Sequence, residues 1–296
     1  MPFHLSAPVS RTLLALAVTT SLAVPPARAQ NLPTAFAAAR GEQDGIYIDA
    51  VRWQALATQP GAKLIDLRAA EAYAAGHIEG AINIPSSLLV VQQGELRNEV
   101  PEKAAIEKIL AAAGLSYDDN LVLYNDAGSG KQFITFHQAG FDKVHILEGG
   151  YKNWKGPTTT LATVPTPSNF QLSRAKADIV SKEYVLGKLG KPGVFIIDSR
   201  PAETYDQGYI PGSYNIPLSL SLDGAAVKPV DELVAALKAV GVTKESEIIT
   251  TCGSGPSASN QLTVLRDLGY RNIKLYDGSW NEWQLDPTTP KASKKV

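Results

Sequence analysis

One block of this chain is written twice: Gly76-His77-Ile78-Glu79-Gly80-Ala81-Ile82-Asn83-Ile84-Pro85 and, at an offset of 132, Gly208-Tyr209-Ile210-Pro211-Gly212-Ser213-Tyr214-Asn215-Ile216-Pro217. The same offset relates the preceding segments Ile65-Asp66-Leu67-Arg68 and Ile197-Asp198-Ser199-Arg200. Nearer the end of each copy, residues 148–154 match residues 277–283 at an offset of 129. Such self-similarity indicates two copies of one domain, which agrees with a length of 296 residues.

Each copy alternates strand-like and helix-like patterns. In the second copy the short apolar runs at 194–197 and 247–250 are typical of buried parallel strands. Asp49 and Ser181 stand at matching N-cap positions before the opening helices. The sequence therefore predicts an α/β fold of two domains, each a mostly parallel sheet flanked by helices. We place the domains at residues 40–155 and 173–290, with a Thr- and Pro-rich linker over 156–172.

The first thirty residues differ in composition from the rest. Arg11 precedes an apolar run that extends to Val24, and Ala27-Arg28-Ala29 has the small-x-small pattern of a cleavage site. Because this run is short for a bilayer span, we interpret residues 1–29 as a cleaved signal peptide rather than a stable membrane anchor. We therefore expect a periplasmic or secreted protein. A net charge of −1 gives no electrostatic basis for a nucleic-acid partner.

Cys252 is the only cysteine of the chain, and it separates a strand-like run from a helical pattern in Cys252-Gly253-Ser254-Gly255-Pro256-Ser257. Loop N–H groups and the positive end of a helix dipole both favour a thiolate over a thiol. The glycines on either side of Ser254 argue against a cysteine that is merely packed in the core. We therefore predict that Cys252 is the catalytic nucleophile. The lack of a second thiol argues against a dithiol oxidoreductase.

The first copy has no cysteine at the matching place. Counting from the strand aligns Cys252 with Asp126, whereas aligning the two Gly-Ser-Gly triplets places it opposite Ala127. With either alignment the first copy lacks a thiol. We therefore predict that residues 40–155 form an inactive domain that supports the catalytic one.

Together these motifs resemble the tandem-domain rhodanese family of sulfurtransferases. The resemblance covers both copies and rests on residues 198–200, the two Gly-x-Ile-x-Gly segments, residues 276–283 and the Cys252 loop. It implies that the cysteine takes a sulfane sulfur from a small anionic donor as a persulfide. It also implies transfer to a thiophilic acceptor, such as a thiol or cyanide, without a cofactor. Arg200 matches the family's substrate-binding arginine, and we predict that the loop residues Gly253, Ser254, Gly255, Pro256 and Ser257 also bind the donor. Pro256 and Ser257 stand where the family usually has Val-Thr, and Ser254 either polarises a donor through its hydroxyl or simply fits the turn.

Several roles remain open at this level. The start Cys-Gly-Ser-Gly resembles the 3-mercaptopyruvate branch of the family, but that branch often has a second arginine in an insertion, and residues 201–207 contain no basic residue. Thiosulfate is therefore the alternative donor. Arg200 has a structural salt bridge as its alternative role, because Arg68 holds the equivalent place in the inactive copy. For His77, in a tight turn, a structural role is favoured over assistance in catalysis.

Other classes of protein fit less well. A cysteine phosphatase shares this loop architecture but needs an arginine six residues after the cysteine, where this chain has Ala258. One cysteine and scattered histidines offer no spacing typical of a metal site. The remaining alternative is a periplasmic sulfur-carrier or binding module, in which Cys252 holds sulfur for a partner without turnover.

Overall fold

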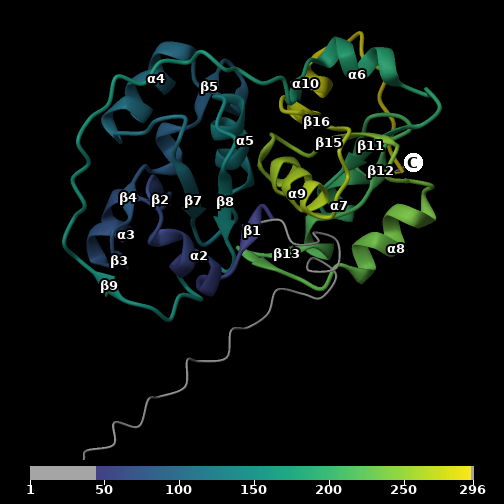
Figure 1. Ribbon diagram of the computed structural model, residues 1–296. Coiled ribbons are helices and arrows are strands. Elements are labelled where there is room, and N and C mark those ends of the chain that lie inside the picture. Colours follow the sequence, from purple (N-terminus) through teal and green to yellow (C-terminus); the bar gives the residue numbers. More distant parts are fainter. Residues whose placement is uncertain (1–44, 295–296) are drawn as a thin grey trace, which may run out of the picture.

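Each copy contains a parallel sheet. The computed structural model describes residues 45–294 and has two five-stranded sheets whose neighbouring strands are all parallel. Figure 1 shows the first copy in purple to teal and the second in green to yellow. The predicted signal peptide, residues 1–29, lies outside the described residues.

The two sheets have the same strand order. The first runs β1-β8-β7-β2-β4, with the strands Tyr47–Ile48, Val144–Leu147, Asn120–Tyr124, Ala62–Asp66 and Ile82–Asn83. The second runs β10-β16-β15-β11-β12, with the strands Ile179–Val180, Ile273–Tyr276, Glu247–Thr251, Val194–Asp198 and Tyr214–Asn215. The predicted α/β fold and its internal repeat are therefore confirmed.

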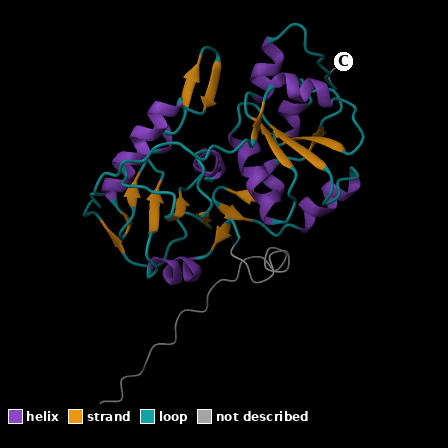
Figure 2. Cartoon of the chain, turned by 45° about the horizontal axis from the view of Figure 1, so that its top comes forward, coloured by secondary structure: helices purple, strands orange, loops and turns teal. Residues whose placement is uncertain are grey.

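Helices flank both sheets (Figure 2). In the first copy they are α2 (Ala50–Ala57), α3 (Ala70–Ala75), α4 (Lys103–Ala112), α5 (Gly130–Gln138) and the 3-10 turn η1 (Ser86–Leu88). In the second they are α6 (Lys182–Lys188), α7 (Ala202–Tyr205), α8 (Asp231–Ala239), α9 (Pro256–Asp267), α10 (Ser279–Leu285) and η2 (Leu218–Leu220). Asp49 and Ser181 cap α2 and α6 as predicted, since each side chain accepts a backbone N–H of its helix.

The central strand pairs of both sheets have the same register at their carboxyl ends. Asp66, the last residue of β2, lies opposite Tyr124, the last of β7, and Asp198 in β11 lies opposite Thr251 in β15. The loops after β7 and β15 therefore begin at equivalent points. Open α/β sheets bind their ligands at this carboxyl edge, and Cys252 is the first residue beyond it.

The copies pack against each other through α5 and α9. At this contact the N–H of Gly130 donates to Asn260 Oδ1 (2.7 Å), and a Cβ at Gly130 would collide with the Asn260 backbone. The hydroxyls of Tyr47 and Thr263 share a hydrogen bond of 2.8 Å. Buried apolar residues of both copies form one continuous cluster. Since α9 follows the Cys252 loop directly, this packing brings the first copy to the predicted site.

The linker follows the outer surface of the first copy (Figure 1). It contributes β9 (Thr158–Thr159), which pairs antiparallel with β3 (His77–Ile78), and it buries Phe170. Two antiparallel hairpins stand apart from the main sheets, β5–β6 (Val91–Gln93 and Leu96–Glu99) and β13–β14 (Leu222–Asp223 and Ala226–Val227). Within residues 45–294, no helix has the length and apolar character that a membrane span needs.

Candidate active site

The Cys252 loop forms the centre of the site. The Cys252 side chain is 3% exposed, and its Sγ accepts a hydrogen bond from the N–H of Gly255 (3.1 Å). The other loop residues predicted to bind the donor are half-buried, namely Gly253, Ser254, Pro256 and Ser257. The structure therefore gathers the predicted thiol and the predicted binding loop on one turn.

The sequence of the loop accounts for its shape. Gly255 has φ = +99°, a left-handed conformation that glycine adopts freely, and a Cβ at this position would collide with Asp277. Pro256 occupies the first position of α9, where a missing N–H costs nothing. The helical pattern leaves the amides of Ser257 and Ala258 without an intrahelical acceptor. Both amides therefore belong to the positive end of the α9 dipole, and α9 begins directly after the Cys252 loop.

The start of α10 holds the loop from behind. The backbone N–H groups of Trp280 and Asn281 donate to the carbonyl oxygens of Cys252 and Gly253 (both 3.0 Å). These bonds occupy the loop carbonyls, so the loop can present N–H groups to the sulfur. The motif at residues 276–283, which resembled the family only by sequence, thus holds the Cys252 loop in place.

Ser279 is a site residue that the sequence did not single out. Its Oγ accepts the N–H of Cys252 (3.1 Å), donates to Tyr276 O (2.9 Å) and lies 3.9 Å from Cys252 Sγ. Ser279 has φ = +55°, a conformation that costs a non-glycine residue roughly 1 kcal/mol. The first copy has Gly150 here, with φ = +60°. A serine where the first copy has a glycine is the sequence signal that marks this position.

Arg200 borders the loop, but its guanidinium is held within the second copy. Nε and Nη2 donate to the Asp198 carboxylate (3.0 and 2.7 Å), and Nη2 also donates to Gly208 O (2.9 Å). Nη1 makes a longer contact with Thr204 O (3.4 Å). A Cβ at Gly253 would lie 4.0 Å from Arg200 Cδ. The structure thus contains the salt bridge that was the alternative role of Arg200, and its contact with a donor stays a prediction.

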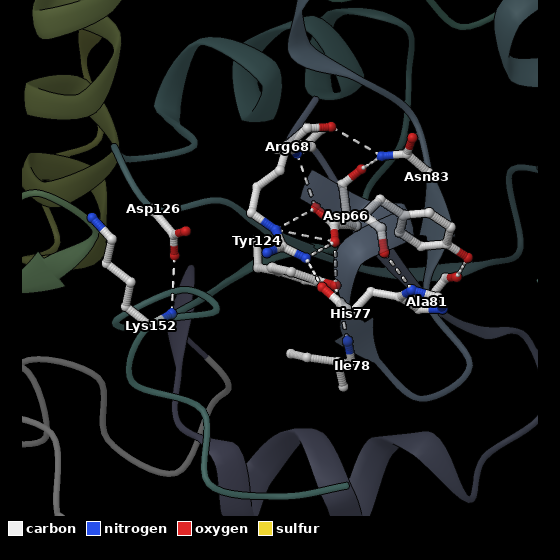
Figure 3. A network of polar contacts seen from close by, with 12 residues as sticks. Asp66, Arg68, His77, Ile78, Ala81, Asn83, Tyr124, Asp126 and Lys152 are labelled. Atoms are coloured by element: carbon white, nitrogen blue, oxygen red, sulfur yellow. Dashed lines mark hydrogen bonds and ion pairs between the residues drawn. The ribbon is translucent and has the colours of Figure 1, made fainter. Parts of the chain in front are cut away.

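The first copy contains the same ion pair (Figure 3). Arg68 Nε donates to Asp66 Oδ1 (3.0 Å) and Nη2 donates to Gly76 O (2.8 Å). Asn83 Nδ2 donates to the carbonyl oxygens of Asp66 and Arg68 (2.9 and 3.0 Å), and Asn215 makes the equivalent bonds in the second copy (3.1 and 2.8 Å). The repeated motif is therefore a scaffold that both copies use to fix the sheet edge.

A buried ion pair joins the copies beneath the loop. Lys131 on α5 pairs with Asp277, which follows β16, and each side chain is only 4% exposed. Burial raises the pKa of the Asp277 carboxyl, and the Lys131 charge opposes this rise. Because Asp277 Oδ1 lies directly under Gly255, the first copy supplies the cation that accompanies this carboxylate.

The strand register corrects the alignment of the two loops. Each loop begins immediately after its strand, so Cys252 corresponds to Asn125. The alignments predicted from the sequence, with Asp126 or Ala127, are therefore wrong. Asn125 Oδ1 accepts the N–H of Ala127 (2.5 Å), as Sγ accepts an N–H in the second copy. The prediction that the first copy lacks a thiol is unaffected.

Loop length explains why the alignment was wrong. Five residues join β7 to α5, whereas four join β15 to α9. Gly128 has φ = +96° and takes the place of Gly255, so the two Gly-Ser-Gly triplets do not correspond. A one-residue difference inside a loop leaves no mark on the flanking patterns.

Comparison with known families matches both copies. The Rhodanese-like domain matches residues 50–157 and 181–286, which together make up more than half of the chain. The chain belongs to the rhodanese family. Its two rhodanese domains are the two copies described above.

Curated relatives extend across both rhodanese domains. A thiosulfate sulfurtransferase from Azotobacter vinelandii is 28% identical over 260 residues, covering 83% of this chain and 96% of that protein. A 3-mercaptopyruvate sulfurtransferase from Escherichia coli (strain K12) is 29% identical over 235 residues, covering 74% of this chain and 84% of that protein. The relatives thus include sulfurtransferases named for each of the two expected donors.

A solved structure shares the two-domain arrangement. The crystal structure of SseA from Escherichia coli, described as showing the rhodanese fold and catalytic mechanism of 3-mercaptopyruvate sulfotransferases, aligns with a TM-score of 0.72 at 26% identity. The alignment covers 80% of this chain and 99% of that one. The rhodanese fold of this protein is therefore established.

His77 lies in the core of the first rhodanese domain. Its side chain is completely buried and its ring stacks on Tyr73, with the ring centroids 3.6 Å apart. Nδ1 lies 2.8 Å from Tyr73 O and Nε2 lies 3.2 Å from Leu161 O. Both ring nitrogens face backbone carbonyls, so His77 ties its turn to the linker. This geometry agrees with the structural role that the sequence favoured.

Two cavities accompany these features. One of about 230 Å³ lies between the rhodanese domains and is lined by Asn98, by residues of the first-domain loop and α5, and by Pro256 and Asn260 of α9. A larger one of about 490 Å³ lies in the first domain, where linker residues Thr163 and Pro165 form part of its wall. The smaller cavity places Pro256, a predicted donor-binding residue, at the space between the domains.

Proposed function

We propose that this rhodanese is a sulfurtransferase that carries sulfur from a small anionic donor to a thiophilic acceptor as a Cys252 persulfide. The observation that carries the proposal is the N–H of Gly255, which donates to the only cysteine sulfur of the chain at the start of α9. An N–H and a helix dipole both stabilise negative charge on sulfur. This support applies equally to the thiolate and to the persulfide anion.

In the first half-reaction, the Cys252 thiolate attacks the sulfane sulfur of the donor. An S–S bond forms as the bond from that sulfur to the rest of the donor breaks, and the leaving group takes the electron pair. Thiosulfate releases sulfite. From 3-mercaptopyruvate the carbon leaves as an enolate, which takes up the thiol proton to give pyruvate. In the second half-reaction, a thiolate or cyanide attacks the outer sulfur, and Cys252 leaves as the thiolate. Electrons balance without an oxidant or reductant.

The residues of the loop have separate parts in this scheme. The backbone N–H groups of residues 255, 257 and 258 hold the charge that moves between sulfur and donor. Ser279, with its hydroxyl 3.9 Å from Sγ, supplies a side-chain hydroxyl near the sulfur. For Arg200 we propose a donor contact through Nη1, because Nε and Nη2 are engaged by Asp198. For residues 1–29 we propose export to the periplasm or the exterior.

The donor belongs to the class of small sulfur-bearing anions, and thiosulfate and 3-mercaptopyruvate are its two candidates. The relatives named for each of them support the class. Comparing kcat/KM for the two donors on the protein lacking residues 1–29 selects between them, with cyanide or a small thiol as the acceptor.

Intact mass measurement tests the persulfide directly. We expect the wild type to gain one sulfur atom after donor is added and Cys252→Ser to gain none. Residual sulfur transfer by Cys252→Ser would contradict the mechanism. A wild type that gains sulfur but passes it to no small acceptor would instead be a sulfur-carrier module. Cell fractionation with and without residues 1–29 tests export.

A further inference from the structure

The β5–β6 hairpin of the first rhodanese domain reaches the catalytic loop of the second. Asn98, on β6, places its Nδ2 3.2 Å from Ser254 Oγ and 3.4 Å from Ser254 O. At the next residue, Glu99, burial and the charge of Asp277 raise the pKa of the carboxyl, and the Lys131 charge opposes this rise. The hairpin therefore contacts the loop that carries Cys252.

The opposite hairpin makes a different kind of contact. The β13–β14 hairpin of the second domain meets the first domain through its backbone, where Gly149 N–H donates to Ala225 O (3.0 Å). The β5–β6 hairpin instead makes its contact through a side chain, since the Asn98 amide donates to the Ser254 hydroxyl. Asn98 also has φ = +63°, which asparagine tolerates better than most residues. The hairpin thus holds a specific polar group against Ser254.

The direction of this hydrogen bond matters for chemistry. When an amide N–H donates to a hydroxyl oxygen, the proton of that hydroxyl remains available for another acceptor. Ser254 lies two residues after Cys252 and is half-buried. Asn98 also lines the cavity of about 230 Å³ between the domains, as does Pro256 at the start of α9, so its side chain borders both this cavity and Ser254.

We propose that Asn98 is a positioning residue, supplied by the inactive domain, that orients the Ser254 hydroxyl toward an anionic group bound at Cys252. This proposal rests on the sulfurtransferase function proposed above. If Asn98 has this role, the first domain takes a direct part in the site. Without the hairpin, the Ser254 hydroxyl lacks the amide N–H that sets its orientation.

A double-mutant cycle tests the proposal. Asn98→Gly keeps the left-handed backbone but removes the amide, so we expect a loss of about three- to tenfold in kcat/KM. In a Ser254→Ala background the same change should cost nothing further, because the group that Asn98 orients is absent. Asn98→Asp should lose more than Asn98→Gly, since a carboxylate accepts the serine proton and repels an anionic donor. Equal losses in both backgrounds, or none in either, would overturn the proposal.

A second readout separates this proposal from the proposed function. The rates at which Cys252 reacts with iodoacetate and with neutral iodoacetamide are compared in wild type, Asn98→Gly and the control Gln93→Ala, which is exposed on the same hairpin. Asn98→Gly should lower the ratio of the iodoacetate rate to the iodoacetamide rate, and Gln93→Ala should leave this ratio unchanged. A wild type that gains no sulfur from either donor overturns the proposed function, while an unchanged ratio overturns the role of Asn98. Urea unfolding checks that each variant is folded.

Discussion

The loop after β15 holds a thiol under the N–H of Gly255, whereas the loop after β7 holds an amide oxygen under the N–H of Ala127. Both loops leave equivalent strands and both turn on a glycine with φ near +100°. The two copies therefore share the turn and differ in the atom that it presents. Comparing them separates the residues that build the fold from those that perform the chemistry.

Residues that are present in both copies make the same structural contacts in each copy. The Asp66–Arg68 pair matches the Asp198–Arg200 pair. The hydroxyl of Tyr73 donates to a backbone carbonyl eight residues later (2.8 Å), as its counterpart Tyr205 does in the second domain (2.7 Å). The occurrence of a residue in both copies thus indicates that it stabilises the fold. The chemistry is to be sought where the copies differ, at Cys252, Ser279 and the loop length.

The largest expected effect comes from giving the Cys252 loop the side chain that the first copy has at the equivalent position. Cys252→Asn should reduce sulfur transfer to the uncatalysed background, because an amide is no nucleophile. The fold should survive, since Asn125 already occupies this turn in the first copy. Turnover assays and urea unfolding measure both parts. If Cys252→Asn keeps transfer activity, the two loops do not differ in the way proposed here.

The second prediction concerns the ion pair between Lys131 of the first domain and Asp277 of the second. Lys131→Met leaves Asp277 buried without its cation, which should cost about 3–5 kcal/mol of unfolding free energy. Asp277→Asn combined with Lys131→Met should recover part of this loss, because no uncompensated charge remains. Urea unfolding of the wild type, Lys131→Met and the double variant provides the values. A single variant as stable as the wild type would show that the pair contributes nothing.

The deficit of Lys131→Met should depend on pH. Burial already raises the pKa of Asp277, and removing Lys131 raises it further. A carboxyl with a raised folded-state pKa stabilises the protein below its unfolded pKa, about 4. That stability is lost as the pH rises through the folded-state value. The variant should therefore approach the wild type as the pH falls toward 4, and a deficit that is constant with pH would contradict this account.

The matched arginines test whether a scaffold residue has a second role. Arg200→Ala and Arg68→Ala each remove one partner of a buried ion pair, so both should lower the melting temperature. A donor contact is worth roughly 1.5–3 kcal/mol, so Arg200→Ala alone should also lose about 10- to 150-fold in kcat/KM. Activity is measured where both variants are folded. Equal activity losses would leave Arg200 with the salt bridge as its whole role.

The smallest effect is expected in the inactive loop. Asn125→Ala removes the bond to Ala127 N–H and should cost about 0.5–1.5 kcal/mol of stability, with turnover within about threefold of wild type. Asp126→Ala is its matched control. Asp126 is the next residue of the same loop, and its side chain also accepts one backbone N–H, that of Lys152 (3.0 Å; Figure 3). An activity loss comparable to that of Cys252→Asn would show that the first domain contributes chemistry.

Local and periodic patterns in the sequence predicted the domains, the strands and the starts of two helices. The doubled Gly-x-Ile-x-Gly block revealed two domains, the apolar runs revealed parallel strands, and Asp49 and Ser181 marked helix starts. These features could be predicted because strands, helices and caps depend on residues near one another in the chain. The single cysteine between a strand and a helix pointed to the reactive loop for the same reason.

Contacts between distant segments were decided by the tertiary structure alone. Asn98 meets Ser254 across 156 positions and Lys131 meets Asp277 across 146. No pattern along the chain encodes either pair, because both depend on the close packing of α5 on α9. The one-residue difference between the loops was settled only by strand register. The sequence thus specified the domains and the thiol, whereas packing decided which groups of the first domain reach the surroundings of the thiol.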